Sequence, residues 1–90
     1  MEEIIVDIFE GFRPIGLWSS KFMILSQGVV TVCSSKSRET EYRLAVNILE
    51  TTNVDDEELT SLWKTGQKDF FVRFSSKAEK EHWHGLMYGN

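Results

Sequence analysis

The hydrophobic pattern of this chain changes its period once, close to Ser76, and no other feature of the sequence constrains the fold as much. Before Ser76, apolar residues form short runs and alternating segments separated by turn residues, which is the pattern of β-strands. After Ser76, they recur with the spacing of an α-helix. The sequence therefore predicts a mainly β domain that ends in one C-terminal helix.

Seven segments have the length and composition of strands. In the clearest of them, Tyr42 and Leu44 fall on one face while Glu41 and Arg43 fall on the other, as expected for a strand that is buried on one side. The expected strands are residues 4–9, 21–25, 29–33, 41–46, 47–54, 60–65 and 69–74, of which 47–54 is the weakest. The acidic run 55–58 is expected to be a solvated loop. At this length, we expect residues 1–90 to form a single domain.

The helix is expected to begin near Lys77. Ser76 and Glu79 have the spacing of a capping box, in which each side chain satisfies an amide group of the first helical turn. One side of the helix is apolar and is expected to be buried. This stripe consists of the aliphatic stem of Lys80 together with Trp83, Leu86 and Met87.

Two histidines flank the tryptophan in the segment "EKEHWHGLM". On a helix, His82 and His84 lie on opposite sides of the buried stripe, so their imidazoles cannot converge on one metal ion. The sequence also contains no GxSxG, P-loop or CxxC motif, and no recognisable spaced carboxylate pair. We therefore expect no catalytic residue, no metal site and no cofactor.

Charge and cysteine usage narrow the classes of function. The 14 acidic and 10 basic residues give a net charge of -4 at pH 7, which disfavours binding to nucleic acid. The one cysteine, Cys33, lies in an apolar run, where a buried thiol in a reducing, cytoplasmic setting is expected. The start of the chain carries acidic residues where a secretory signal has basic ones. No apolar run approaches the roughly 20 residues that span a bilayer.

The order of these elements resembles that of the pleckstrin homology (PH) domain. The resemblance rests on "KFMILSQGVVTVC" (residues 21–33), similar to the family's second and third strands, and on "DFFVRFSSKAEKEHWHGLM" (residues 69–87), similar to its last strand and helix. It implies a PH-like, seven-stranded, bent antiparallel β-sandwich or barrel that an α-helix caps, with Trp83 inserted between the sheets. The segments "EYRL" and "FSSKAEKEHW" are most similar to PH domains of Dbl-type Rho guanine-nucleotide exchange factors, which implies a small-GTPase pathway. Phospholipase-type PH domains share the same helix pattern.

The resemblance raises the question of phosphoinositide binding. PH domains that bind inositol phosphates tightly have a lysine near the end of the first strand and two basic residues on the second. Here Asp7 and Glu10 stand near the end of the first strand, and the second keeps only Lys21 of the two bases. The remaining basic residues of the rim around the first and third inter-strand loops are the expected lipid-binding residues: Arg13, Lys21, Lys36, Arg38 and Arg43. Ordinary solvated loop charge is an equal alternative to weak contact with anionic phosphoinositide membranes.

Protein binding is the competing class of function. Trp18, Phe12 and Trp63 lie near segment ends, where an exposed aromatic side chain can anchor a partner, although packing in the core is the common alternative. A peptide groove between the fifth strand and the helix, as in phosphotyrosine-binding folds, is a third possibility. We expect a non-catalytic adaptor or regulatory module of a cytoplasmic signalling protein, which binds a protein partner or an adjacent domain, with weak membrane contact as an additional role. The alternative is a phosphoinositide-binding module at the inner face of the plasma membrane.

Overall fold

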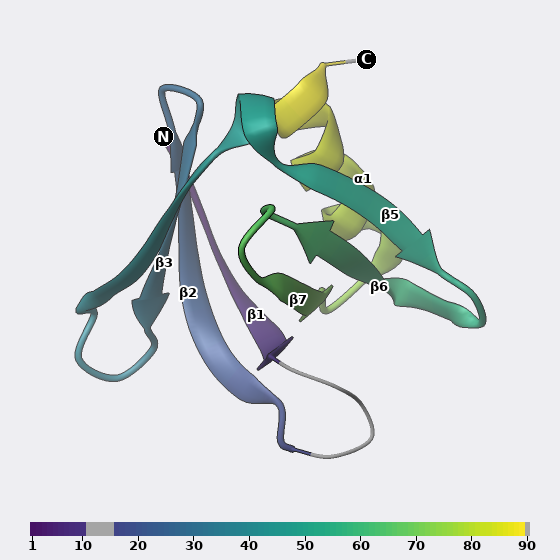
Figure 1. The fold of residues 1–90 in the computed structure, drawn as a ribbon, viewed down its shortest axis with the longest axis horizontal. Helices are drawn as coiled ribbons and strands as arrows, with labels where there is room; N and C mark the ends of the chain where they lie inside the picture. Colours follow the sequence, from purple (N-terminus) through teal and green to yellow (C-terminus); the bar gives the residue numbers. More distant parts are fainter. Residues whose placement is uncertain (11–15, 90) are drawn as a thin grey trace.

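The computed structural model describes residues 1–10 and 16–89 of the 90-residue chain. Figure 1 shows strands followed by one helix, in the order that the sequence predicts. In chain order, the elements are β1 (Glu2–Glu10), β2 (Ser19–Ser26), β3 (Val29–Ser34), β4 (Thr40–Ala45), η1 (Val46–Ile48), β5 (Glu50–Val54), β6 (Glu57–Lys64), β7 (Asp69–Arg73) and α1 (Lys77–Tyr88).

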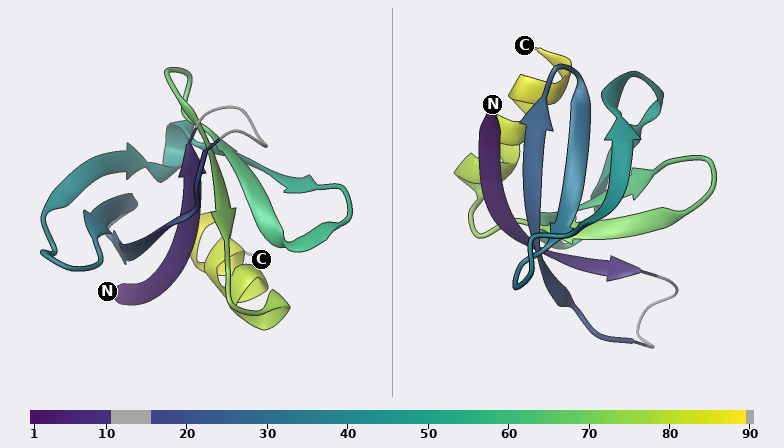
Figure 2. Two further views of the ribbon diagram at one scale, coloured as in Figure 1. Left: turned by 90° about the horizontal axis from the view of Figure 1, so that it is seen from below. Right: turned by 90° about the vertical axis from the view of Figure 1, so that its left-hand side faces the viewer.

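The seven strands form one antiparallel sheet in the order β4-β3-β2-β1-β7-β6-β5. Strand β1 belongs to both halves of this sheet, because it pairs with β2 from Glu2 to Ile8 and with β7 from Asp7 to Glu10. The two halves are steeply inclined to each other, and α1 lies beside the half that contains β5 and β6 (Figures 1 and 2). The predicted PH-like bent sheet with a helical cap is confirmed.

The hydrophobic core fills the space between the two halves of the sheet and the helix. Trp63 is 0% exposed and Trp83 is 2% exposed, and both belong to the same cluster of buried side chains. Phe70, Val72 and Phe74 alternate onto the inner face of the last strand segment, as predicted. Trp83 therefore closes the core from the helix side, in the place that the resemblance implies.

The first turn of α1 is capped much as the sequence predicts. The Ser76 Oγ accepts a hydrogen bond from the backbone N–H of Glu79 at 3.1 Å, and the helix begins at Lys77. The Glu79 carboxylate accepts a hydrogen bond from the hydroxyl of Ser75 at 2.6 Å. The carboxylate thus holds the preceding serine side chain where a complete capping box would use the backbone amide of Ser76.

Two predicted boundaries around β5 are wrong. Residues Val46–Ile48 form a short 3-10 helix, in which the Leu49 N–H donates to the carbonyl of Val46 at 3.2 Å, so the strand begins only at Glu50. The solvated loop 55–58 shrinks to a turn at residues 55–56, and β6 begins at Glu57. Local hydrogen bonding and strand pairing set both boundaries. The period of hydrophobic residues in the sequence shows neither the hydrogen bonds nor the pairing.

The predicted buried stripe of α1 is wrong at one residue. Lys80, Trp83 and Met87 are buried, but the side chain of Leu86 is 41% exposed. His84, which is half-buried, lies on the buried side in its place. The helix therefore faces the sheet along residues 80, 83, 84 and 87, and is rotated slightly from the predicted orientation.

Candidate functional site

Three of the five expected rim residues lie on β2 and in the β3–β4 connection (Figure 1). Lys36 and Arg38 are exposed in the β3–β4 connection, and Lys21 lies on β2, opposite Val6 of β1 and Ser34 of β3. Arg43 lies farther along β4, where it lines a cavity of about 190 Å³ together with Thr65 and Gln67. Arg13 and Phe12 fall outside the described residues. The structure thus brings Lys21, Lys36 and Arg38 to one end and sets Arg43 apart.

The cations of this rim differ in their surroundings. The Lys21 Nζ forms an ion pair with the Glu41 carboxylate at 2.6 Å. The Arg38 guanidinium lies over the ring of Phe22, 4.2 Å from its centroid. Among the described residues, no carboxylate forms an ion pair with Lys36 or Arg38. Of the rim residues that the structure describes at this end, these two side chains, both on one short connection, are therefore the ones that remain available to an anion.

A polar cluster that the sequence did not predict closes the same end of the barrel. The Glu10 carboxylate, at the end of β1, accepts a hydrogen bond from the Tyr42 hydroxyl at 2.6 Å and pairs with the Lys68 Nζ at 2.5 Å. The ammonium group of Lys68 also lies 5.0 Å from the centroid of the Tyr42 ring, and that ring packs against Phe70 at 5.1 Å. The cluster joins β1, β4 and the β6–β7 connection.

The pKa values within this cluster show how the three groups depend on one another. Burial alone would raise the pKa of Glu10, but the hydrogen bonds from Lys68 and Tyr42, with the charge of Lys68, lower it. Burial and the hydrogen bond to Glu10 raise the pKa of the Tyr42 hydroxyl. The same carboxylate raises the pKa of Lys68 by its hydrogen bond. The ionised form of Glu10 is therefore favoured, and it accepts a hydrogen bond from each of the two partners.

A second cluster lies on the outer face of the sheet, around Trp18. The half-buried indole packs edge-on against Phe9, with ring centroids 5.5 Å apart. The Arg73 guanidinium lies 4.1 Å from the centroid of the Trp18 ring and donates a hydrogen bond to the Asp7 carboxylate at 3.0 Å. The structure thus places Trp18 at the surface, held between an aromatic ring and a paired cation.

The prediction that Trp63 contacts a protein partner does not fit its position. Its side chain is 0% exposed, because it projects from β6 into the core opposite Phe70.

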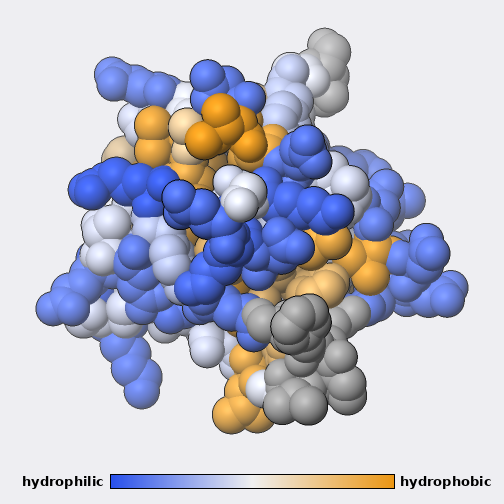
Figure 3. Space-filling view, viewed as in Figure 1, coloured by the Kyte–Doolittle hydropathy of each residue, from blue (hydrophilic) through white to orange (hydrophobic). Residues whose placement is uncertain are grey.

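Two apolar side chains beside Trp63 on β6 and β7, Leu62 and Phe71, point to the outer face and are half-buried. Together with the exposed Ile48, these two line an open cavity of about 990 Å³. Figure 3 shows hydrophobic surface on this side, interrupted by hydrophilic side chains.

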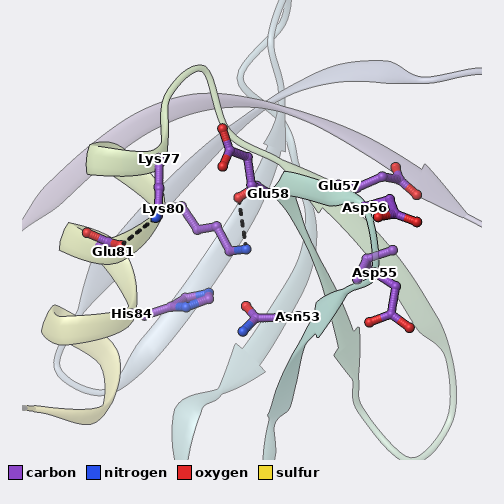
Figure 4. A pocket seen from close by; sticks show the side chains of 10 residues that line it. Asn53, Asp55, Asp56, Glu57, Glu58, Lys77, Lys80, Glu81 and His84 are labelled. Carbon is purple, nitrogen blue, oxygen red and sulfur yellow. Dashed lines mark hydrogen bonds and ion pairs between the residues drawn. The ribbon is translucent and has the colours of Figure 1, made fainter.

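A groove of about 1020 Å³ separates the β5–β6 hairpin from the first turns of α1. Asn53 projects from β5 toward His84 on the helix, and Lys80 crosses from the helix to the start of β6 (Figure 4). Its ammonium group donates to the carbonyl oxygens of Glu58 at 3.0 Å and Thr60 at 3.2 Å. The other side chains around the groove are mostly acidic: Asp55, Asp56, Glu57, Glu58 and Glu81, with Lys77 as the second cation.

His84 lines this groove and is half-buried. Its Nε2 lies 3.2 Å from the Ser61 Oγ, and its ring packs edge-on against Phe74. Burial, helped by the charge of Lys80, lowers the pKa of His84 from its ordinary value of 6.5. The unfolded chain therefore binds a proton at higher pH than the folded one does.

We expect the free energy of unfolding to be greatest above pH 6.5 and to fall as the pH drops below that value, because protonation of His84 then favours the unfolded chain. Chemical denaturation between neutral pH and about pH 5 measures this slope. His84→Gln should show a shallower slope than the wild type. His82→Gln is the control, because His82 is exposed, and it should keep the wild-type slope. Equal slopes for wild type and His84→Gln would contradict the assignment.

The described residues contain no group of three or more His, Cys, Asp or Glu side chains that could hold a metal ion. Within residues 1–10 and 16–89, no helix is long and apolar enough to cross a lipid bilayer. Neither a protein-family model nor a curated protein matches the sequence.

Solved structures match the fold closely, although their sequences differ. The PH domain of ArhGAP27 has a TM-score of 0.77 at 15% identity, covering 97% of this chain and 96% of that one. The C-terminal PH domain of pleckstrin, in complex with D-myo-Ins(1,2,3,5,6)P5, has a TM-score of 0.76 at 14% identity, covering 97% and 90%. A structure of the Vav1 exchange factor has a TM-score of 0.75 at 9% identity, but the match covers only 24% of that chain and 96% of this one. The chain therefore has the pleckstrin homology fold.

Proposed function

We propose that this chain is a non-catalytic adaptor or regulatory module of a cytoplasmic signalling protein, and that it binds a protein partner or an adjacent domain. Weak contact with anionic membranes is an additional role. The resemblance of "EYRL" and "FSSKAEKEHW" to PH domains of Dbl-type exchange factors supports a place in a small-GTPase pathway. The fold similarity to the Vav1 exchange factor agrees with that place.

The observation that carries this proposal is the pairing of basic side chains with the chain's own carboxylates. Lys21 pairs with Glu41, Lys68 pairs with Glu10, and Arg73 pairs with Asp7. A phosphate that approached any of these cations would have to displace a carboxylate or lie beside it. Either event costs favourable charge interactions or adds like-charge repulsion. Tight binding of an inositol phosphate is thus opposed at Lys21, the one base that the second strand keeps.

The surface around Trp18 supports the protein-binding role. Tryptophan and arginine are enriched among the side chains that dominate binding energy at protein interfaces. Here the two are stacked on each other and held by Phe9 and Asp7, so little conformational entropy remains to be lost on binding. The half-buried side chains of Leu62 and Phe71 lie on the same face of the sheet.

The second candidate function is phosphoinositide-dependent membrane targeting. One observation favours it: no carboxylate of the described residues forms an ion pair with Lys36 or Arg38. Each basic residue near an anionic surface contributes about 1 kcal/mol. The net charge of -4 opposes this attraction. We therefore propose a contact through these residues that is weak and sensitive to salt.

The test is an NMR titration of the labelled chain with soluble inositol 1,4,5-trisphosphate, followed by liposomes that contain phosphatidylinositol 4,5-bisphosphate. We expect no saturable shifts with the soluble ligand at millimolar concentration, and only salt-sensitive binding to the liposomes, which Lys36→Ala/Arg38→Ala should weaken. Saturation at micromolar ligand, with shifts centred on Lys21, Lys36 and Arg38, would reverse the order of the two functions.

Glu10→Gln provides a direct test of the pairing argument. The variant removes the negative charge that holds Lys68, so its affinity for liposomes that contain phosphatidylinositol 4,5-bisphosphate should rise by roughly fivefold, as expected when one partly exposed charge is removed. Glu2→Gln makes the same change of charge at the other end of β1 and should leave the affinity at the wild-type level. Equal affinities for the two variants would show that Glu10 does not block an anion.

The protein-binding role is tested on the aromatic side chain. Trp18→Ala should reduce capture of a cellular partner by the immobilised chain, whereas Lys21→Ala/Arg38→Ala should retain it. Thermal melting of each variant controls for loss of folding, because Trp18 also packs against Phe9. Capture that survives Trp18→Ala but is lost in the basic double variant would contradict the proposed surface.

A further inference from the structure

We propose that the cavity between β4 and the β6–β7 connection, here called the seam cavity, binds a carboxylate side chain of a protein partner. An apolar side chain of the same partner segment occupies the larger cavity beside it. This inference rests on the proposed protein-binding function, because it extends the surface around Trp18 and names the partner chemistry at its far end. Three features carry it: the size of the seam cavity, its unused hydrogen-bond donors, and a row of apolar side chains that leads to it.

The seam cavity is small and mostly apolar. Its volume is about 190 Å³, and its lining consists of Arg43, Leu44, Ala45, Ile48, Leu49, Thr65 and Gln67. Cavities that hold a whole small molecule usually measure roughly 300 to 1,000 Å³. The seam cavity therefore suits one side chain of a partner rather than a complete cofactor or metabolite.

Two polar side chains of this lining have donors without acceptors. Arg43 is exposed, and within residues 1–10 and 16–89 its guanidinium forms neither an ion pair nor a hydrogen bond. The backbone N–H of Gln67 donates to the Thr65 Oγ1 at 3.4 Å, but the Gln67 carboxamide forms no hydrogen bond with the described chain. The Thr65 hydroxyl itself donates to the carbonyl of Lys68 at 2.8 Å. A carboxylate accepts hydrogen bonds at both of its oxygens, so it complements the two unused donors.

The distribution of charge also favours an acidic group at the seam cavity. On the outer face beside it, Lys64 lies between Glu50 of β5 and Asp69 of β7 in the strand register, so carboxylates offset its charge. The acidic residue of β4, Glu41, is held in an ion pair by Lys21 and does not offset Arg43. A carboxylate is therefore attracted to the seam cavity, whereas an ammonium group is repelled.

An apolar row connects the seam cavity to the surface around Trp18. Ile48 lines both the seam cavity and the larger cavity of about 990 Å³, which Leu62 and Phe71 also line. Phe71 lies opposite Leu62 on one side and opposite Phe9 on the other, and Phe9 packs against Trp18. Adjacent strands are about 4.8 Å apart, so the row from β1 to β6 measures about 10 Å, which about three extended residues span. A short segment can therefore place apolar side chains on this row and a carboxylate at its end.

The experiment is an NMR titration of the labelled chain with the capped peptide acetyl-Ala-Leu-Leu-Glu-Ala-amide, and separately with its Gln counterpart, at physiological salt. The Glu peptide should shift amide resonances of residues 43–49 and 65–67, and it should bind roughly fivefold more tightly than the Gln peptide, as expected for one partly exposed charge pair. Arg43→Gln should abolish this difference and leave the affinity for the Gln peptide unchanged. Lys77→Gln, with the same change of net charge at an exposed position on α1, should keep the difference.

Several results would overturn the inference. Equal affinities of the wild type for the two peptides, or no shift at millimolar Glu peptide, would exclude a carboxylate site. Equal effects of Arg43→Gln and Lys77→Gln would indicate nonspecific attraction. Saturation of the same resonances by inorganic phosphate at lower concentration than by the Glu peptide would assign the seam cavity to a phosphate group instead.

The outcome is independent of the test of the proposed function. If the peptides fail while capture of a partner depends on Trp18, only the seam cavity is excluded and the proposed function stands. If the Glu peptide binds as expected while capture survives Trp18→Ala, the seam cavity stands and the role of Trp18 is wrong.

Discussion

Replacing Trp83 with alanine should remove roughly 3 to 5 kcal/mol from the free energy of unfolding, which is comparable to the whole stability of many small domains. The side chain is 2% exposed and belongs to the core cluster that both halves of the sheet contribute to. Its removal would leave a large cavity between the helix and the sheet, and surrounding side chains can fill it only in part. Urea denaturation followed by circular dichroism measures the loss.

Two further variants keep this expectation testable if Trp83→Ala does not fold. Trp83→Phe should lose a smaller part of the stability, because an aromatic ring still fills most of the site. Leu86→Ala also removes an apolar side chain from α1, but that side chain is 41% exposed, so the loss should be below about 1 kcal/mol. Similar losses for Trp83→Ala and Leu86→Ala would mean that Trp83 does not close the core.

The contrast between these two helix residues shows what the sequence could predict. The capping serine and the change of period located the helix and its tryptophan, because both are local features. The direction of the buried stripe was wrong at Leu86, because the sheet accepts the ammonium group of Lys80 and the ring of His84 on the buried side. Hydropathy alone does not show that the sheet carries carbonyl and hydroxyl groups that form hydrogen bonds with these two polar side chains.

The candidate site depended on pairings between residues distant in the sequence. Glu10 meets Lys68 because β1 pairs with β7, with Glu10 opposite Phe70. Lys21 reaches Glu41 across β3, beside a register shift between Val32 and Cys33. Neither contact follows from composition or local period, so the sequence points to Lys21 without its partner Glu41 and to Glu10 without its partner Lys68.

The predictions for Trp18 and Trp63 had different outcomes for a similar reason. Trp63 shares its face of β6 with the small polar Ser61, while Leu62 points outward, so the hydrophobic alternation of this strand is weak. Trp18 lies at the surface, and its contacts with Phe9 and Arg73 depend on how β1, β2 and β7 come together. Exposure of an aromatic residue near a strand end is therefore decided by register.

Lys80 is the second residue whose replacement should have a large effect. It is 7% exposed, and its ammonium group donates hydrogen bonds to the carbonyl oxygens of Glu58 and Thr60. Replacement of Lys80 would leave both carbonyl oxygens without this donor. Hydrogen bonds from charged groups contribute about 1.5 to 3 kcal/mol, and the buried stem adds packing. We expect Lys80→Ala to lower the free energy of unfolding by about 2 to 4 kcal/mol in urea denaturation.

Lys80→Met separates the two contributions, because methionine keeps much of the apolar stem and lacks the donor. Its loss should lie between those of Lys80→Ala and the wild type. Lys77→Ala is the matched control: it removes a lysine one turn earlier on the same helix, where the side chain is 63% exposed and its ion pair with Glu81 is long at 4.0 Å. A loss in Lys77→Ala equal to that in Lys80→Ala would mean that the ammonium group of Lys80 does not tie α1 to β6.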